Sequence, residues 1–236
     1  MKSLFSDAFI LFKPKAVISG DFYFVHQNPI NASHENKLIT IAAVDCTGHG
    51  VPGAFMSLMG FERLTDAVQI SSDPSQILSL LNIGIKNSLH QSGNTETATG
   101  DGMDIVLCVI DRANNKVKYS GANRPLWIIR KDNSSVEEIK PTKRTIGGLT
   151  ANNQIFASHE IQLNPGDCLY LFSDGYADQF SGGTEKKLMT KRFKEILLDI
   201  QHQTMEEQKH YLDSFIENWK ADTDQVDDIL VIGVKL

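Results

Sequence analysis

The chain has 236 residues, a formal net charge of −6, 41% hydrophobic residues and 22% charged residues. This composition is ordinary for a globular protein that buries a sizeable core. The acidic balance argues against nucleic acid or an anionic membrane as the main partner, because both require a basic face. No apolar run approaches the roughly 18 residues of a membrane span, and no secretory signal opens the sequence, so we expect a cytoplasmic protein.

Short apolar runs rich in Val, Ile, Phe and Tyr predict the strands. In chain order these runs are Ala16–Ile18, Phe22–His26, Leu38–Val44, Ile105–Ile110, Lys116–Ser120, Leu126–Arg130, Cys168–Phe172 and Ile229–Val234. Turn signals separate them, at Asn31–Asn36 for example, and their spacing favours hairpins and antiparallel sheet over a series of βαβ units.

Helical periodicity predicts two pairs of helices. The first pair covers Pro52–Ile70 and Ser75–His90, and the second covers Lys191–Ile200 and Met205–Lys220. We interpret their apolar stripes as core packing; the members are Phe55, Leu58, Met59 and Leu64, then Ile77, Leu80, Leu81 and Ile85, then Leu212, Phe215, Ile216 and Trp219. This order of strands and helices predicts sheet layers covered by helices.

Two polar stretches and the cysteines complete the pattern. Gln91–Gly102 reads as a loop, and the glycine-containing segment Thr142–His159 is predicted to form a mobile flap. The cysteines, Cys46, Cys108 and Cys168, are odd in number and widely spaced. This favours buried free thiols in a reducing compartment over a disulfide or a catalytic role.

Aspartates occupy the points where several predicted strands meet loops. Asp21, Asp45, Asp174 and Asp227 each stand between apolar residues and a Gly- or Asp-containing turn. Carboxylates that converge at a sheet edge repel one another unless a cation neutralises them. Oxygen ligands without Cys or His spacing suit Mg²⁺ or Mn²⁺ better than Zn²⁺. The residues alone therefore indicate a hydrolase that depends on a divalent metal.

The strongest local signal is the segment Asp45–Ala54. An apolar strand delivers a carboxylate, glycines then permit a tight turn, and a helix starts at once. The alternative is an ordinary strand–turn–helix connection. Ser173–Asp178 repeats the pattern more weakly. Asp227 and Asp228 place two like charges side by side before a buried strand, and a bound cation is the simplest explanation for them.

Taken in order, these strings resemble a known family. Ser19–Tyr23, Asp45–Gly50, Ser173–Gly175 and Asp227-Asp228 are similar to the motifs of PPM-type (PP2C-like) serine/threonine phosphatases. The strings Gly121–Leu126 and Asp101–Asp104 resemble more narrowly the bacterial SpoIIE/RsbU branch. The resemblance implies an α+β fold, a four-layer α-β-β-α sandwich of two antiparallel β-sheets flanked by helices. It implies a single phosphatase domain over residues 1–236, in which residues 1–15 are a possible stub of a linker to a sensor region.

The resemblance also implies a centre of two metals, Mn²⁺ or Mg²⁺, with a possible third. Asp45 would bridge both metals, and the backbone carbonyl of Cys46 would bind one of them. Asp174 and Asp227 would hold the second metal, and Asp21 would bind directly or through water. For the third metal the resemblance offers Asp104 or Asp101.

Such a centre activates water for in-line attack on phosphorus without a phosphoenzyme. His49 is a candidate to protonate the leaving serine oxygen; a turn histidine bonded to backbone is an equal alternative. No arginine precedes Arg63, although animal and plant relatives carry a phosphate-binding arginine near the N-terminus. Lys13 or Lys15 could substitute, but we expect the metals to hold most of the phosphate.

The leading hypothesis is a protein phosphoserine/phosphothreonine phosphatase that acts on a STAS-type anti-sigma antagonist in a partner-switching pathway. The alternatives are a catalytically silent PP2C-like regulatory domain and a hydrolase of small phosphoesters or nucleotides; the absence of a Walker-type loop weakens the nucleotide reading. The branch also implies an N-terminal sensor domain in a longer parent protein. Leu4–Phe12 fits either a surface that packs on a sensor or a second copy, giving a homodimer, or a first edge strand.

Overall fold

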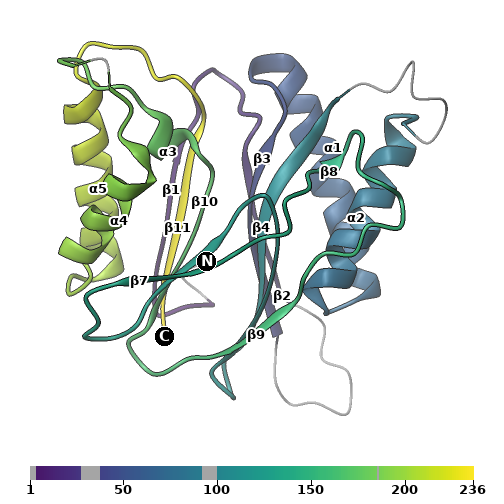
Figure 1. Cartoon of the computed structure of the whole chain (residues 1–236), viewed down its shortest axis with the longest axis horizontal. Coiled ribbons are helices and arrows are strands. Elements are labelled where there is room, and N and C mark those ends of the chain that lie inside the picture. Colours follow the sequence, from purple (N-terminus) through teal and green to yellow (C-terminus); the bar gives the residue numbers. More distant parts are fainter. Residues whose placement is uncertain (1–3, 28–37, 92–99, 185) are drawn as a thin grey trace.

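The computed structural model describes residues 4–27, 38–91, 100–184 and 186–236. Two β-sheets lie face to face between two layers of helices (Figure 1). The first sheet has the order β1-β11-β10-β6-β7, and the second has the order β2-β3-β4-β5-β9, with β8 paired to β4. All of these strand pairs are antiparallel. The predicted α+β sandwich is confirmed.

The strands of the first sheet are β1 (Asp7–Lys13), β6 (Leu126–Ile129), β7 (Val136–Ile139), β10 (Cys168–Phe172) and β11 (Ile229–Lys235). Those of the second sheet are β2 (Phe22–Gln27), β3 (Leu38–Cys46), β4 (Gly102–Asp111), β5 (Lys116–Ala122), β8 (Ile146–Gly147) and β9 (His159–Gln162). The helices are α1 (Gly50–Ile70), α2 (Pro74–Ser88), α3 (Gly175–Asp178), α4 (Met189–Asp199) and α5 (Met205–Lys220).

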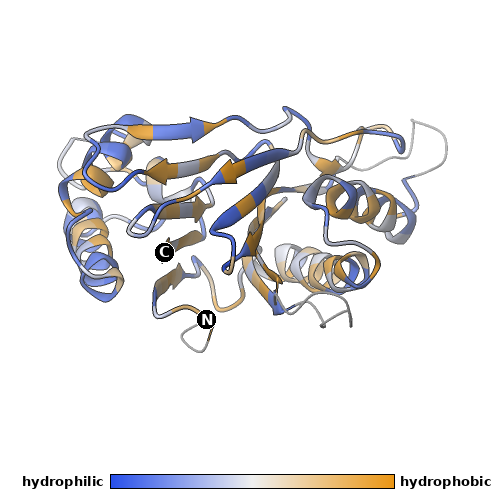
Figure 2. Cartoon of the chain, turned by 90° about the horizontal axis from the view of Figure 1, so that it is seen from below, coloured by the Kyte–Doolittle hydropathy of each residue, from blue (hydrophilic) through white to orange (hydrophobic). Residues whose placement is uncertain are grey.

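The core has three layers of apolar side chains. One lies between the sheets, a second under α1 and α2, and a third under α3, α4 and α5. Figure 2 shows the two helical layers on opposite sides of the sheets. Strand β10 serves two layers, since Leu169 and Leu171 face the other sheet while Tyr170 and Phe172 face the helices. Central strands buried on both faces read as continuous apolar runs, which is why the sequence revealed them.

Helix α1 departs from its predicted packing. Leu64 is buried as expected, but Phe55 and Leu58 are 66% and 68% exposed. The buried face instead combines large and small residues, namely Gly53, Met56, Gly60, Leu64, Ala67 and Val68. Gly60 lets the helix approach β2 and β4 closely, because a Cβ there would collide with the Met103 side chain. The prediction for Phe55 and Leu58 is wrong. The stripes of α2 and α5 are confirmed, with Ile77, Leu81, Ile85, Leu212 and Ile216 fully buried.

The N-terminal prediction also changes. Ala16–Ile18 forms no strand, and the side chain of Val17 is fully exposed. The first strand is β1, an edge strand paired along its whole length with β11, so the edge-strand interpretation of Leu4–Phe12 is confirmed. The predicted turn Asn31–Asn36 lies outside the described residues. Within the described parts of the chain, no helix is long and apolar enough to cross a membrane.

The segment predicted to be a mobile flap is instead tied to α2. Asn82 donates from Nδ2 to the Ala151 carbonyl at 2.9 Å and accepts from the Gly147 amide at 2.8 Å. The buried ammonium of Lys86 donates to the Thr150 carbonyl. These polar side chains satisfy backbone groups that would otherwise be buried without partners. All three cysteines are buried and free, as predicted.

Candidate metal centre

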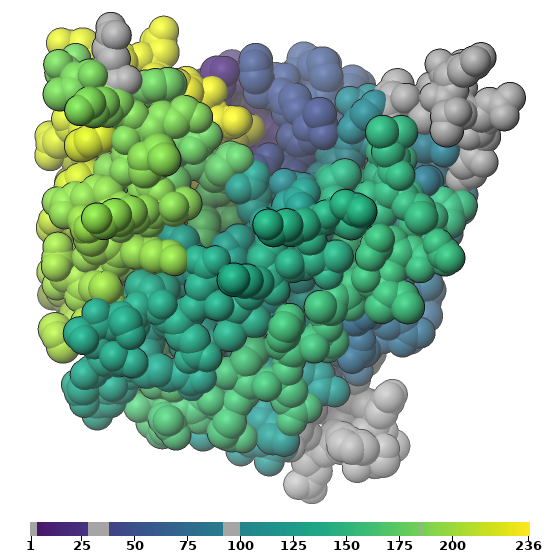
Figure 3. All heavy atoms as spheres, in the orientation of Figure 1, coloured from purple at the N-terminus to yellow at the C-terminus, as the bar shows by residue number. Residues whose placement is uncertain are grey.

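Carboxylates from both sheets meet at one edge of the sandwich. Asp45 is the penultimate residue of β3, and Asp104 lies directly opposite it on β4. Asp21 precedes β2, Asp174 follows β10, and Asp227 precedes β11. These strand ends lie at the top of Figure 1. In Figure 3 the N-terminal part of the chain (purple), the region around the start of α1 (blue) and the C-terminal part (yellow) meet there. The predicted convergence of strand-end aspartates is therefore present.

Asp21 is placed by close backbone contacts and by a neighbouring aspartate. A Cβ on Gly20 would collide with the Gly48 carbonyl, so only glycine lets this segment reach the turn after β3. The buried carboxylate of Asp228 accepts from the amides of Lys15 at 2.7 Å and Gly20 at 2.8 Å. Asp228 therefore anchors the loop that carries Asp21, and amides rather than a cation meet its charge.

Asp174 is fixed by a second close approach. A Cβ on Gly175 would collide with the Asp228 carbonyl, so the start of α3 packs directly on the start of β11. The Ser173 amide donates to the Leu230 carbonyl at 3.0 Å, and the Leu230 amide donates to Ser173 Oγ at 3.1 Å. Ser173 and Gly175 thus each have a structural reason, and together they fix the position of Asp174 between them.

Arg124 is the cation at the centre of this cluster. Its Nη2 lies 2.6 Å from Asp45 Oδ2, 2.7 Å from Asp174 Oδ2 and 3.6 Å from Asp104 Oδ2. The neighbouring Asn123 donates from Nδ2 to Asp104 Oδ1 at 2.9 Å. Sequence reasoning used the string Gly121–Leu126 only as a family motif and missed this role. The available signal was an arginine two residues after β5, the strand that pairs with the one carrying Asp104.

The lysines suggested as substitutes lie elsewhere. Lys13 Nζ pairs with Asp213 and with Glu217 on α5, the latter at 2.8 Å. Lys15 is exposed and contributes its backbone amide to Asp228. Of these three cations, only Arg124 contacts the aspartates of the cluster.

The electrostatics show that one guanidinium does not balance the cluster. Burial, and then the charge of Asp45, raise the pKa of Asp21 to about 9. Burial raises the pKa of Asp45 to about 7, although Arg124 opposes this, and Asp174 adds to the rise. Burial also raises the pKa of Asp227, and the hydrogen bond from the Asp228 amide lowers it by less. Carboxylates that resist ionisation together indicate that further positive charge would stabilise the site.

The donor set fits hard divalent cations. Asp21 is 4% exposed, and its Oδ2 has no hydrogen-bond partner among the described residues. An orphaned buried carboxylate oxygen is costly unless something binds it, and carboxylates are preferred ligands of Mg²⁺ and Mn²⁺. As they stand, no three Asp, Glu, His or Cys side chains of the described chain form a ready ion site. The guanidinium lies between Asp45 and Asp174.

Two further predicted residues lie at the same edge. Cys46 is buried at the end of β3, opposite Met103 of β4, so its backbone follows Asp45 directly into the turn. His49 is exposed at the start of α1, and its side chain makes no capping hydrogen bond there. The alternative was a turn histidine bonded to backbone, and a capping bond to the backbone of α1 is not part of the structure.

Comparisons with known proteins agree with this geometry. The family model for Stage II sporulation protein E (SpoIIE) matches residues 35–236. The chain belongs to the SpoIIE family. No curated protein shows a significant match to this SpoIIE-family chain.

Solved structures place this family member among PP2C phosphatase folds. The SiaA-PP2C domain of Pseudomonas aeruginosa is 29% identical, with a TM-score of 0.82 over 97% of this chain and 85% of that one. The PP2C phosphatase domain of Bacillus subtilis SpoIIE, with a fragment of its regulatory domain, is 19% identical, with a TM-score of 0.75 over 98% of this chain and 63% of that one. RsbX in complex with magnesium is 17% identical, with a TM-score of 0.64 over 97% and 94% of the two chains. The latter two share the fold.

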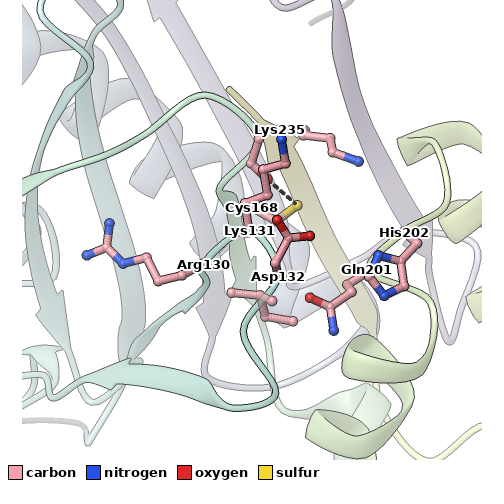
Figure 4. A pocket seen from close by; sticks show the side chains of 9 residues that line it. Arg130, Lys131, Asp132, Cys168, Gln201, His202 and Lys235 are labelled. Carbon is pink, nitrogen blue, oxygen red and sulfur yellow. Dashed lines mark hydrogen bonds between the residues drawn. The ribbon is translucent and has the colours of Figure 1, made fainter.

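A pocket of about 180 Å³ lies at the opposite end of β10 (Figure 4). Its lining includes Cys168, the first residue of β10, and His202 from the connection between α4 and α5. None of the clustered aspartates lines it. The pocket is therefore separate from the acidic edge.

Proposed function

We propose that this SpoIIE-family chain is a metal-dependent protein serine/threonine phosphatase, formed by a single domain over residues 1–236. The observation that carries the proposal is the convergence of strand-end carboxylates, among which Asp21, Asp45 and Asp227 have raised pKa values. Among the described residues, Arg124 is the arginine that pairs with this cluster, through Asp45 and Asp174. A phosphatase needs concentrated positive charge to stabilise a phosphoryl group in transfer. Carboxylates supply that charge indirectly, by holding metal ions.

The proposed ligands follow from position. Asp45 lies between Asp104 on one side and the Arg124-linked Asp174 on the other, which suits a residue shared by two cations. Asp174 and Asp227 would hold one of them, and Asp21 with the Cys46 carbonyl would hold the other. Asp104 would serve a third. Mn²⁺ and Mg²⁺ are the candidate ions, since every one of these donors is an oxygen.

Bound in this way, a pair of divalent cations would activate water and neutralise phosphate oxygens. The chain's own contribution is orientation. Asp228 fixes the loop of Asp21, the Gly175 contact fixes Asp174, and the β3–β4 ladder fixes Asp45. His49, exposed at the start of α1, is the proposed donor of a proton to the leaving serine or threonine oxygen.

Family membership supports the proposed substrate and setting. We infer a phosphorylated STAS-type protein in a bacterial partner-switching pathway, with residues 1–15 as the link to an N-terminal sensor in a longer parent protein. A homodimer in that setting is a further proposal.

The test is hydrolysis of a phosphoserine protein and of an aryl phosphate with and without Mn²⁺. Wild type should turn over only with metal, and Asp45→Asn should lose turnover while keeping its melting temperature. Asp132→Asn, an exposed aspartate beside the pocket of Figure 4, is the matched control and should behave like wild type. Metal-independent turnover, or an active Asp45→Asn variant, would overturn the proposal.

A further inference from the structure

We propose that Arg124 is an internal counterion that competes with the metal ions for Asp45 and Asp174 and thereby sets the metal affinity of the site. The inference rests on the proposed metal centre and adds a residue that regulates it. A single nitrogen, Arg124 Nη2, lies within 2.7 Å of a carboxylate oxygen of each of these two aspartates.

The guanidinium and a metal ion would use the same oxygens. Oδ2 of Asp45 and Oδ2 of Asp174 each accept a charge-assisted hydrogen bond from Arg124. Because one nitrogen lies between these two oxygens, a cation that binds both of them must displace the guanidinium. The free energy of those two hydrogen bonds is then subtracted from the free energy of metal binding.

The surrounding backbone is built to hold this side chain in place. Asn123 adopts a left-handed conformation with φ of 58°, and its amide donates to the Thr142 carbonyl at 2.9 Å. The Tyr119 hydroxyl donates to the Arg124 carbonyl at 2.7 Å. A Cβ on Gly121 would collide with that same hydroxyl, so glycine is required there. The turn is fixed by these contacts, which leaves side-chain torsions as the means by which the guanidinium leaves the aspartates.

The guanidinium is strongly paired but incompletely satisfied. The Arg124 side chain is 16% exposed, and its buried Nε has no hydrogen-bond partner among the described residues. Arginine does not lose its proton in proteins, so the competing charge is present at every working pH. A residue of this kind stabilises the metal-free cluster against its own repulsion and yields to a divalent ion, which brings twice the charge.

The experiment measures Mn²⁺ binding by calorimetry and melting temperature with and without a chelator. Arg124→Met should bind Mn²⁺ about tenfold more tightly than wild type or better, because the competing ion pairs are gone. The same variant should melt at a lower temperature than wild type in chelator and gain more from added Mn²⁺. Arg130→Met is the matched control, since Arg130 also pairs with two carboxylates, Glu137 and Asp167, away from the cluster. Its Mn²⁺ affinity should stay within about twofold of wild type.

Arg124→Gln covers the case in which the methionine variant does not fold. A neutral amide keeps a polar side chain but removes the competing charge, so this variant should also bind Mn²⁺ more tightly than wild type. Unchanged or weaker Mn²⁺ binding in the folded Arg124 variants, with normal binding by wild type, would overturn the counterion and leave the metal centre standing. No Mn²⁺ binding by wild type would overturn the metal centre and, with it, this inference.

Discussion

Strand β10 has an aspartate just outside each end, and the two differ in almost every physical respect. Asp167 is 1% exposed and accepts hydrogen bonds from the amides of Lys131 and Asn164 and from Arg130 Nη1, each at 2.9 Å. The side chain of Asp174 is 40% exposed and is paired with Arg124, which also serves Asp45. The carboxylate of Asp167 is therefore buried and surrounded by hydrogen-bond donors, whereas that of Asp174 is partly exposed and shares its arginine with Asp45.

The pKa values follow the same division. Burial opposes ionisation of Asp167, but the amides of Asn164 and Lys131 and the charge of Arg130 outweigh it and lower its pKa. At the other end, burial raises the pKa of Asp45 beside the same Arg124 that pairs with Asp174. A buried carboxylate with enough donors stabilises a fold, whereas a cluster with too few donors creates a demand for cations. This contrast separates the structural end of the strand from the proposed functional end.

The largest expected effect is on the activity of Asp174→Asn. Loss of a metal-holding carboxylate should reduce metal-dependent phosphatase activity by on the order of 10²–10³-fold or more. The melting temperature without metal should stay the same or rise, because one repelling charge is gone. Steady-state kinetics at saturating Mn²⁺, beside a melting curve in chelator, tests both parts. A variant that keeps its activity would remove Asp174 from the proposed centre.

Asp167→Asn should show the opposite pattern. The amide keeps the size of the side chain but loses charge-assisted bonds to Arg130 and two backbone amides. We expect a loss of about 1–3 kcal/mol in the free energy of unfolding, with turnover per folded molecule unchanged. Urea unfolding and kinetics on the same preparation check this. Equal stability of variant and wild type would show that these bonds contribute little.

The pH dependence sharpens that prediction. Because the pKa of Asp167 is lower in the folded state than the ordinary value of 3.8, its stabilising effect is present above 3.8 and is lost as the pH falls through the folded value. The unfolding free energies of wild type and Asp167→Asn should therefore converge below pH 3.8 and differ most near neutrality. Urea unfolding across this range measures the difference. A gap that stays constant with pH would mean that the charge of Asp167 does not matter.

The smallest effect is expected on the exposed face of α1. Leu58→Ser should change the free energy of unfolding by no more than about 0.5 kcal/mol, because the side chain lies in solvent. Leu64→Ala, on the buried face of the same helix, should cost about 2–5 kcal/mol. Chemical denaturation of both variants tests the assignment of the two faces. A large loss at Leu58 would show that this face is covered.

The sequence predicted elements best where a local signal and burial agreed. Helix α5 was predicted with its observed bounds from its apolar periodicity, and the structure adds a capping box at its start, formed by the side chains of Thr204 and Glu207. Strands β10 and β11 were found because both faces are buried. Strand β7 was missed, since Val136–Ile139 is short and its glutamates point to solvent. Phe55 and Leu58 were wrongly assigned to the core, because hydrophobicity alone does not identify which face of a helix packs against the sheet.

The sequence analysis identified the aspartates of the cluster but not the arginine that pairs with them. Strand-end aspartates are visible as residue types at element boundaries, so Asp21, Asp45, Asp174 and Asp227 could be proposed together. Arg124 depends on a contact between two sheets, between residues 79 and 50 positions apart in the chain. The role of Asp228 was hidden for the same reason, because its partners are amides more than 200 residues away. Long-range pairing of this kind is a property of the fold.

The proposed metal centre requires Asp45 to be shared by two metal ions. Electron paramagnetic resonance during a Mn²⁺ titration tests it directly, since two Mn²⁺ ions joined through one carboxylate are magnetically coupled. We predict a coupled-pair spectrum for wild type that disappears in Asp45→Asn and persists in Asp132→Asn. Only isolated Mn²⁺ signals in wild type, or a coupled pair that survives Asp45→Asn, would show that Asp45 does not join two metal ions.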